Sequence, residues 1–116
     1  MGTQRGSFQP GQGKHDPILA RNLDAGESVK SAGFGALLVP MSRPMTGKVY
    51  VTSSRLAVVL DSGRMWNAYW SDIVNVEVKK SLLAATALVT TSGGEQWGVD
   101  STKSIVGDIN KAWMAS

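Results

Sequence analysis

The sequence of 116 residues has no cysteine and a single histidine, His15. The lack of cysteine excludes a disulfide framework and any zinc site with thiolate ligands. A zinc site would therefore need mostly carboxylates, which is unusual for this metal. A Ser-His-Asp catalytic set would have to use His15, and no nucleophile-elbow motif surrounds any serine. We expect His15 to be solvated, and we expect no metal, no cofactor and no enzymatic activity.

Long hydrophobic runs are also absent. The longest strictly apolar runs have about five residues, whereas a membrane-spanning helix needs roughly 20. Residues 1–17 are polar and lack the apolar segment of a secretory signal peptide. Together with the absence of cysteine, these features predict a cytoplasmic protein, or one located within a virion or another assembly made in the cytoplasm.

Charge of one sign is not concentrated in this chain. The net charge is +3, from 12 basic and 9 acidic side chains. Residues 1–23 contain three cations and one acid, a net charge of +2, so residues 24–116 carry only +1. A nucleic-acid-binding domain usually shows a basic stripe on the domain itself. We therefore expect no nucleic acid among the partners.

The first 14 residues contain little that could form a core. They include four glycines and show no apolar periodicity, which is typical of a flexible arm. Such an arm is either a disordered tail or an anchor that binds a neighbouring chain through Arg5 and Phe8.

A short helix is predicted directly after this arm. Asp16 and Pro17 suit a helix N-cap and first helical position, and the apolar residues that follow would share one face over 16–23. We therefore divide the chain into a flexible N-terminal arm with a short helix, residues 1–22, and one domain, residues 23–116.

The stretch Gly47–Leu60 predicts a β-hairpin. Two segments rich in β-branched and aromatic residues, 48–52 and 55–60, flank Ser53 and Ser54. The second segment is apolar at five successive positions, which favours a strand that is covered on both faces. We expect this hairpin to lie at the centre of a sheet.

Alternation and β-branched content predict further strands at 36–39, 65–70, 74–78, 84–91 and 96–99. Within the third of these, Val74, Val76 and Val78 would share the buried face. Gly33 and Gly35 suggest a bulge or a bend near the first strand.

The C-terminal segment after residue 101 predicts a helix and not a further strand. Ile105, Ile109 and Trp113 recur every four residues, which predicts an amphipathic helix of about three turns. The fold class is therefore mainly β, with six or seven antiparallel strands followed by one C-terminal helix. Four tryptophans either fill the core or line a groove for a ligand or protein partner: Trp66, Trp70, Trp97 and Trp113.

Several segments, in this order, resemble GRAM domains and bacterial pleckstrin-homology-like (PH-like) domains. They are a Gly-Glu-x-Val opening (26–29), an ALLVP strand (36–40), a G-x-V-Y-V-T-S-x-R-L hairpin (47–56), a W-x-x-x-W-S-D-I-x-x-V segment (66–76) and a terminal helix that ends in an aromatic residue. The resemblance covers residues 23–114 approximately and does not include the N-terminal arm.

The resemblance implies a PH-like barrel of about seven antiparallel strands in two near-orthogonal sheets, capped at one end by the C-terminal helix. The matched residues would have structural roles. Thr52 and Ser53 would shape the hairpin turn, Arg55 would hydrogen-bond across it, Ile73 would point inward and Trp113 would close the end of the barrel.

These observations predict a non-enzymatic module for protein interaction or assembly. The partner would be another protein or a second copy of this chain, and a structural component of a larger bacterial or phage assembly is one version of this hypothesis. The N-terminal arm would contact a neighbouring chain. We predict partner-binding roles for Arg5, Phe8, Arg43 and Lys48.

The alternative is peripheral binding to an anionic membrane through basic loops. Eukaryotic relatives in the resembled family often bind phosphoinositides near the loop between their first strands. Lys30, Arg43 and Lys48 could gather near that loop, and Lys79 and Lys80 form a second small cluster. Each exposed cation contributes about 1 kcal/mol near an anionic surface, so this attraction would be weak.

Overall fold

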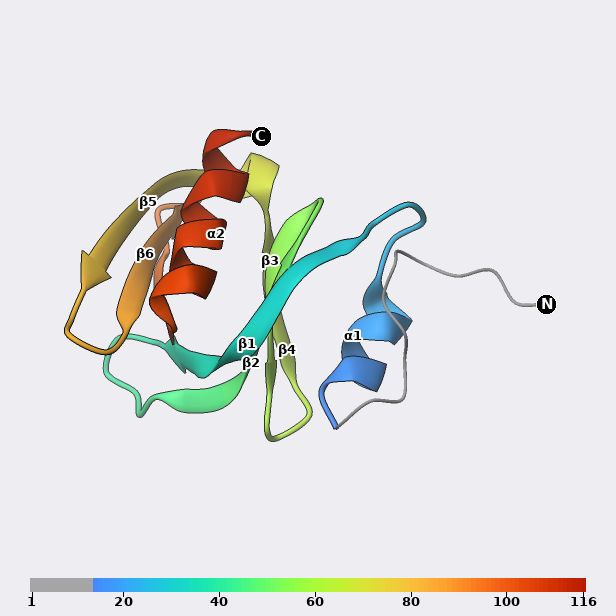
Figure 1. Cartoon of the computed structure of the whole chain (residues 1–116), viewed down its shortest axis with the longest axis horizontal. Helices are drawn as coiled ribbons and strands as arrows, with labels where there is room; N and C mark the ends of the chain where they lie inside the picture. The colour runs from blue at the N-terminus through green and yellow to red at the C-terminus, as the bar shows by residue number, and fades with distance from the viewer. Residues whose placement is uncertain (1–13) are drawn as a thin grey trace.

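The computed structural model describes residues 14–116, so the predicted contacts of Arg5 and Phe8 lie outside the described residues. The predicted order of antiparallel strands followed by a helix is confirmed, with seven strands (Figure 1). The elements are α1 (Asp16–Asn22), β1 (Val29–Leu38), β2 (Met45–Thr52), β3 (Arg55–Leu60), β4 (Met65–Tyr69), the 3-10 helix η1 (Trp70–Asp72), β5 (Ile73–Lys80), β6 (Ala85–Thr91), β7 (Gln96–Ser101) and α2 (Lys103–Met114).

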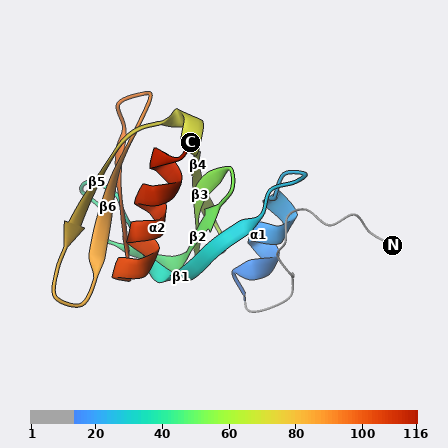
Figure 2. The same ribbon diagram turned by 45° about the horizontal axis from the view of Figure 1, so that its top comes forward.

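The seven strands form one sheet in the order β4-β3-β2-β1-β7-β6-β5, and all neighbouring strands are antiparallel. The sheet is not closed, because β4 and β5 are its two ends and do not pair with each other. The ten-residue β1 pairs with β2 along most of its length and with β7 over 36–38. The sheet curls around α2 on its concave side (Figure 2).

The sheet bends where β1 turns from β2 toward β7. Gly35 and Gly47 face each other at this point. A Cβ atom on Gly35 would lie 2.0 Å from the backbone oxygen of Asp100, and one on Gly47 would lie 2.3 Å from that of Val59. Both positions therefore require glycine, because only a residue without a side chain allows the backbones to approach so closely.

The sequence predicted a bulge or a bend near Gly33 and Gly35. The bend lies at Gly35, and the register shift of β1 lies between Val29 and Ser31, at the start of the strand. A second shift lies between Ile73 and Asn75 in β5. It places the intervening Val74 outward.

Val74 is accordingly 57% exposed, whereas Ile73 and Val76 are buried. The prediction that Val74 shares a buried face with Val76 was therefore wrong. Strict alternation fails at a bulge, because the extra residue reverses the side on which the following side chains lie.

The main core lies between the concave face of the sheet and α2. Residues from β1 to β7 contribute to it, together with Ile105, Val106 and Ile109 of α2. The amphipathic stripe predicted for the C-terminal helix thus faces the core, and Trp113 packs at its margin, where its indole N–H donates to the backbone oxygen of Ile73 at 2.9 Å.

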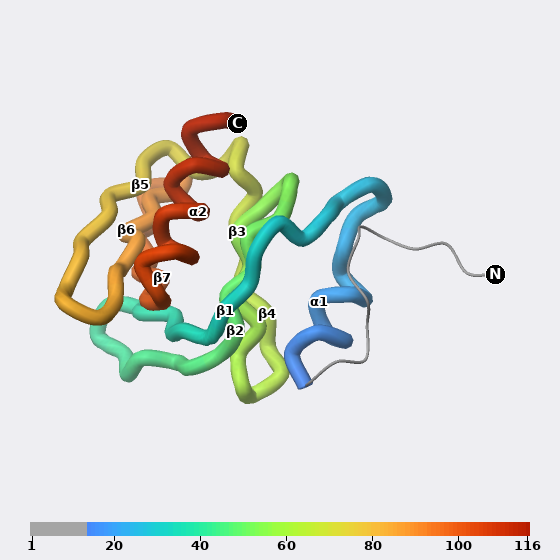
Figure 3. Tube along the Cα trace, viewed as in Figure 1, coloured from blue at the N-terminus to red at the C-terminus, as the bar shows by residue number. Residues whose placement is uncertain are grey.

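A second, smaller core lies on the other face of β2 and β3. Leu19 and Leu23 at α1 pack here against Tyr50, Ala57 and Val59. The helices α1 and α2 therefore lie on opposite sides of the central hairpin (Figure 3). This explains why all six residues of β3 are buried and confirms the predicted strand covered on both faces.

Polar contacts also hold α1 on the sheet. The His15 ring nitrogen Nε2 lies 2.6 Å from Asp61 Oδ1, and Lys48 Nζ lies 2.9 Å from Asp16 Oδ1. Tyr50 donates its hydroxyl hydrogen to the same Asp16 oxygen. His15 is only 6% exposed, so the predicted solvated histidine was wrong. Residues 14–23 thus belong to the same folded body as the strands.

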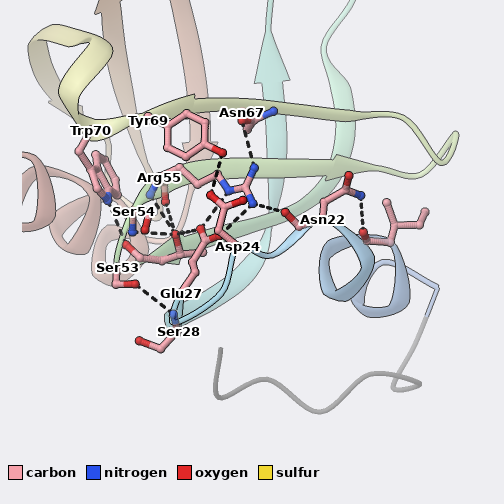
Figure 4. A network of polar contacts seen from close by, with 12 residues as sticks. Asn22, Asp24, Glu27, Ser28, Ser53, Ser54, Arg55, Asn67, Tyr69 and Trp70 are labelled. Atoms are coloured by element: carbon pink, nitrogen blue, oxygen red, sulfur yellow. Dashed lines mark hydrogen bonds and ion pairs between the residues drawn. The ribbon is translucent and has the colours of Figure 1, made fainter. Parts of the chain in front are cut away.

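A buried ion pair joins the segment before β1 to the central hairpin (Figure 4). Glu27 is fully buried, and its two carboxylate oxygens accept hydrogen bonds from Arg55 Nε and Nη2, each at 2.9 Å. The Thr52 hydroxyl donates to Glu27 at 2.5 Å, and the backbone N–H of Asp24 donates at 2.9 Å. The carboxylate is therefore paired with a cation and fully hydrogen-bonded, as a buried charge requires.

Arg55 extends this network to α1 and β4. Its guanidinium donates to the backbone oxygen of Asn22 and to Asn67 Oδ1, and it lies 5.1 Å from the centre of the Tyr69 ring. The backbone N–H of Arg55 donates across the turn to the Thr52 hydroxyl at 2.9 Å, as the resemblance implied. The side chain, in contrast, reaches back to Glu27 instead of remaining at the turn.

We predict that the ion pair between Glu27 and Arg55 makes the free energy of unfolding depend on pH in the acid range. Burial alone raises the pKa of Glu27, but the hydrogen bonds from Arg55 and Thr52 outweigh burial and lower this pKa below its usual value of 4.5. A carboxyl pKa that is lower in the folded state stabilises the fold above the unfolded-state pKa. That contribution is lost as the pH falls through the folded-state pKa.

The free energy of unfolding should therefore fall between about pH 5 and pH 3, measured by urea denaturation at each pH. The Glu27→Gln variant should be about 3 kcal/mol less stable at neutral pH and should show a flatter pH dependence. The exposed Glu95→Gln is the matched control and should keep the wild-type slope. An unchanged slope in Glu27→Gln contradicts the assignment.

Candidate functional site

A groove of about 520 Å³ runs beside the C-terminal half of α2, between this helix, the start of β1 and the β2–β3 hairpin. We call it the α2 groove. Its apolar lining comes from Val51, Trp70 and Ala112, and its polar lining includes Lys30, Ser31, Asp108 and Lys111. An apolar surface with a few polar groups at its rim is the usual composition of a binding site.

The bulge in β1 shapes one side of the α2 groove. Val29 faces Thr52 and Ser31 faces Val51, so Lys30 is the additional residue. Bulges re-aim side chains in this way. Lys30 is exposed at the groove, and the neighbouring Ser31 hydroxyl oxygen is buried without a hydrogen-bond partner among the described residues.

The α2 helix supplies the opposite side. Asp108 and Lys111 are three residues apart and therefore neighbours on the helix surface. Lys111 lies in the last turn, where a cation interacts favourably with the helix dipole. Two cations and one acid border the groove, so it carries a net positive charge from Lys30, Asp108 and Lys111.

Trp70 forms a fixed part of the apolar lining. It begins η1, is 4% exposed and donates its indole N–H to the backbone oxygen of Thr52 at 3.0 Å. The tryptophans were predicted either to fill the core or to line a groove. Trp70 does both, because it belongs to the main core and also lines the α2 groove. Trp66 and Trp97 pack against each other with ring centres 5.5 Å apart.

A second hollow, of about 570 Å³, continues around the end of α2. It shares Trp70 and Ser116 with the α2 groove, and it also includes Ile73, Trp113 and the 71% exposed Met114. The two hollows therefore adjoin at the C-terminal end of α2.

The structure does not bring together the basic residues predicted to bind lipid. Lys30 and Arg43 lie at opposite ends of β1, with Arg43 in the loop that follows this strand, so the predicted gathering near that loop was wrong. Lys48 belongs to β2 and pairs with Asp16. Lys79 and Lys80 end β5, which β1, β7 and β6 separate from β2.

Two other properties concern metals and membranes. Within residues 14–116, no group of three or more histidine, aspartate or glutamate side chains is arranged to hold a metal ion. No helix in this part of the chain is long and apolar enough to cross a membrane.

Most residues of the α2 groove are not predicted from the sequence. Lys30 was predicted as a lipid contact, but Ser31, Asp108 and Lys111 were not identified as site residues. Asp108 and Lys111 could have been found from their position beside the apolar stripe of α2. The role of Ser31 depends on a bulge that has no signal in the sequence.

Comparison with known proteins finds a similar fold but no similar sequence. No protein-family model matches the chain, and no curated protein is similar to it in sequence. Among solved structures, the C-terminal domain of an unknown protein from Leishmania infantum matches with a TM-score of 0.64 and 16% sequence identity. The match covers 87% of this chain and 93% of that domain.

We predict that Ser31→Ala raises the stability of the free protein. A buried hydroxyl without a partner costs about 1–3 kcal/mol, and its removal should recover about 1 kcal/mol of this in thermal or urea unfolding. The matched control is Ser101→Ala on β7, because the Ser101 hydroxyl donates to the backbone oxygen of Phe34 at 2.8 Å. That control should lose about 1 kcal/mol. Equal losses in both variants would show that the Ser31 hydroxyl is hydrogen-bonded.

Proposed function

We propose that this chain is a non-enzymatic protein-interaction module of PH-like fold, and that the α2 groove binds an extended segment of a partner protein. The proposed fold is supported by the strand order and by the single C-terminal helix. The proposed division into two near-orthogonal sheets is supported by the close approach of the backbones at Gly35, where β1 passes from β2 to β7.

The observation that carries the proposal is the chemistry of the α2 groove. Its apolar lining suits an aliphatic or aromatic side chain, because burying such a side chain contributes about 1.5–3 kcal/mol. Lys30 and Lys111 at the rim suit carboxylates on either side of it. The partner segment is therefore apolar at its centre and acidic at its flanks.

Binding of a partner segment in the α2 groove also suggests a role for the whole chain. A module without catalytic groups that holds a segment of another protein serves assembly, and a bacterial or phage assembly in the cytoplasm or in a virion is its proposed setting. Arg5 and Phe8 would add contacts from the N-terminal arm to a neighbouring chain. Arg43 and Lys48 remain proposed contacts, but the ion pair between Lys48 and Asp16 makes Lys48 the weaker candidate.

The test is a selection of peptides from a random display library on the purified protein, followed by titration of the selected peptides by calorimetry and NMR. We expect selected peptides with acidic residues around an apolar centre, and shifts of the amide signals that line the α2 groove. Ala112→Trp should fill the groove and weaken binding at least about tenfold, or about 1.4 kcal/mol. Ser104→Trp adds the same bulk to an exposed position of α2 outside the groove and should bind normally.

A second variant tests the same site in case Ala112→Trp does not fold. Lys30→Glu combined with Lys111→Glu changes only exposed side chains, so the fold should persist while the acidic peptides lose affinity. Binding that survives in both groove variants contradicts the proposed site. A selection that yields no binding peptide contradicts the proposed function.

A further inference from the structure

β5 forms an open end of the sheet. No described strand pairs with its outer side, and Figure 2 shows no element beyond it. It has eight residues and no proline. The opposite end, β4, has only five residues and lines a hollow together with the β6–β7 turn. An open edge offers a row of backbone N–H and C=O groups to another strand.

The charged side chains along β5 are of mixed sign. Glu77 and Lys79 are both exposed, have opposite charge and lie two residues apart, so they share one face of the strand. Exposed apolar side chains lie at both ends of the strand. Val74 near its start is 57% exposed, and Leu82 and Leu83 in the following turn are 86% and 88% exposed.

We propose that a second copy of this chain pairs antiparallel along β5, with the two Val78 residues opposite each other at a two-fold axis. In this register Glu77 of each copy faces Lys79 of the other, which gives two identical cross-strand ion pairs. A shift of the axis to residue 77 would place Glu77 opposite itself, and a shift to residue 79 would do the same with Lys79. Charge complementarity therefore selects one register among these.

The same register also brings together the exposed apolar side chains at the two ends of β5. The start of β5 in one copy lies beside the β5–β6 turn of the other, so Val74 approaches Leu82 and Leu83 at both ends of the paired strands. Apolar area that is exposed in one copy is thus covered in the dimer, and the sheets of the two copies become continuous.

The test is the oligomeric state, measured by sedimentation velocity and light scattering over a range of protein concentrations. Wild type should dimerise, and Glu77→Lys or Lys79→Glu should each weaken dimerisation about tenfold or more, because each places like charges opposite each other. An equimolar mixture of these two variants should dimerise again, since its lysines face glutamates. The double variant Glu77→Lys/Lys79→Glu should also dimerise. Glu95→Lys, in the exposed β6–β7 turn, is the control and should behave as wild type.

Recovery in the mixture cannot come from a general effect on folding, because each variant alone is compared in the same measurement. A strictly monomeric wild type overturns the proposal, and so does unchanged dimerisation of the single variants. A monomer that instead sediments with anionic vesicles, and loses this on substitution of Lys79 and Lys80, assigns the β5 end to a membrane. The α2 groove is tested with peptides and does not depend on this outcome.

Discussion

The fold depends on one buried ion pair, between Glu27 and Arg55. It connects the segment before β1 to the first residue of β3, 28 positions later in the chain. The charge of each partner can remain buried only because the other neutralises it and because Thr52, Asp24 and Asn22 complete the hydrogen bonds. The start of β1 is therefore held at a fixed place beside the hairpin. The bulge that exposes Lys30 at the α2 groove begins only two residues after Glu27.

The central hairpin explains where binding surfaces can occur. The helices α1 and α2 pack on opposite faces of β2 and β3, and the end of this hairpin at Val51, Thr52 and Ser53 lines the α2 groove. Free surface remains at the C-terminal end of α2 and at the outer edge of β5. The α2 groove has an apolar lining bordered by the exposed Lys30 and Lys111, whereas the β5 edge offers backbone groups. The two surfaces therefore suit different occupants, a partner segment and a second copy.

Local patterns predicted the elements well, and long-range contacts account for what they missed. The five apolar residues of β3 and the four-residue spacing in α2 each reflect a single element, so periodicity identified both. His15 looked solvated because its partner, Asp61, lies 46 positions away. Glu27 carries no local signal that it is buried with Arg55. The bulges in β1 and β5 add one residue without any change of composition, so the orientation of Val74 could not be predicted.

A double-mutant cycle would measure how strongly Glu27 and Arg55 stabilise each other. Unfolding free energies would be measured at neutral pH for wild type, Glu27→Gln, Arg55→Met and the double variant. If the pair organises the fold, each single variant leaves a buried partner unpaired and the double variant removes both charges. We expect the sum of the two single losses in unfolding free energy to exceed the loss in the double variant by at least about 2 kcal/mol. Additive losses, equal within about 0.5 kcal/mol, would contradict it.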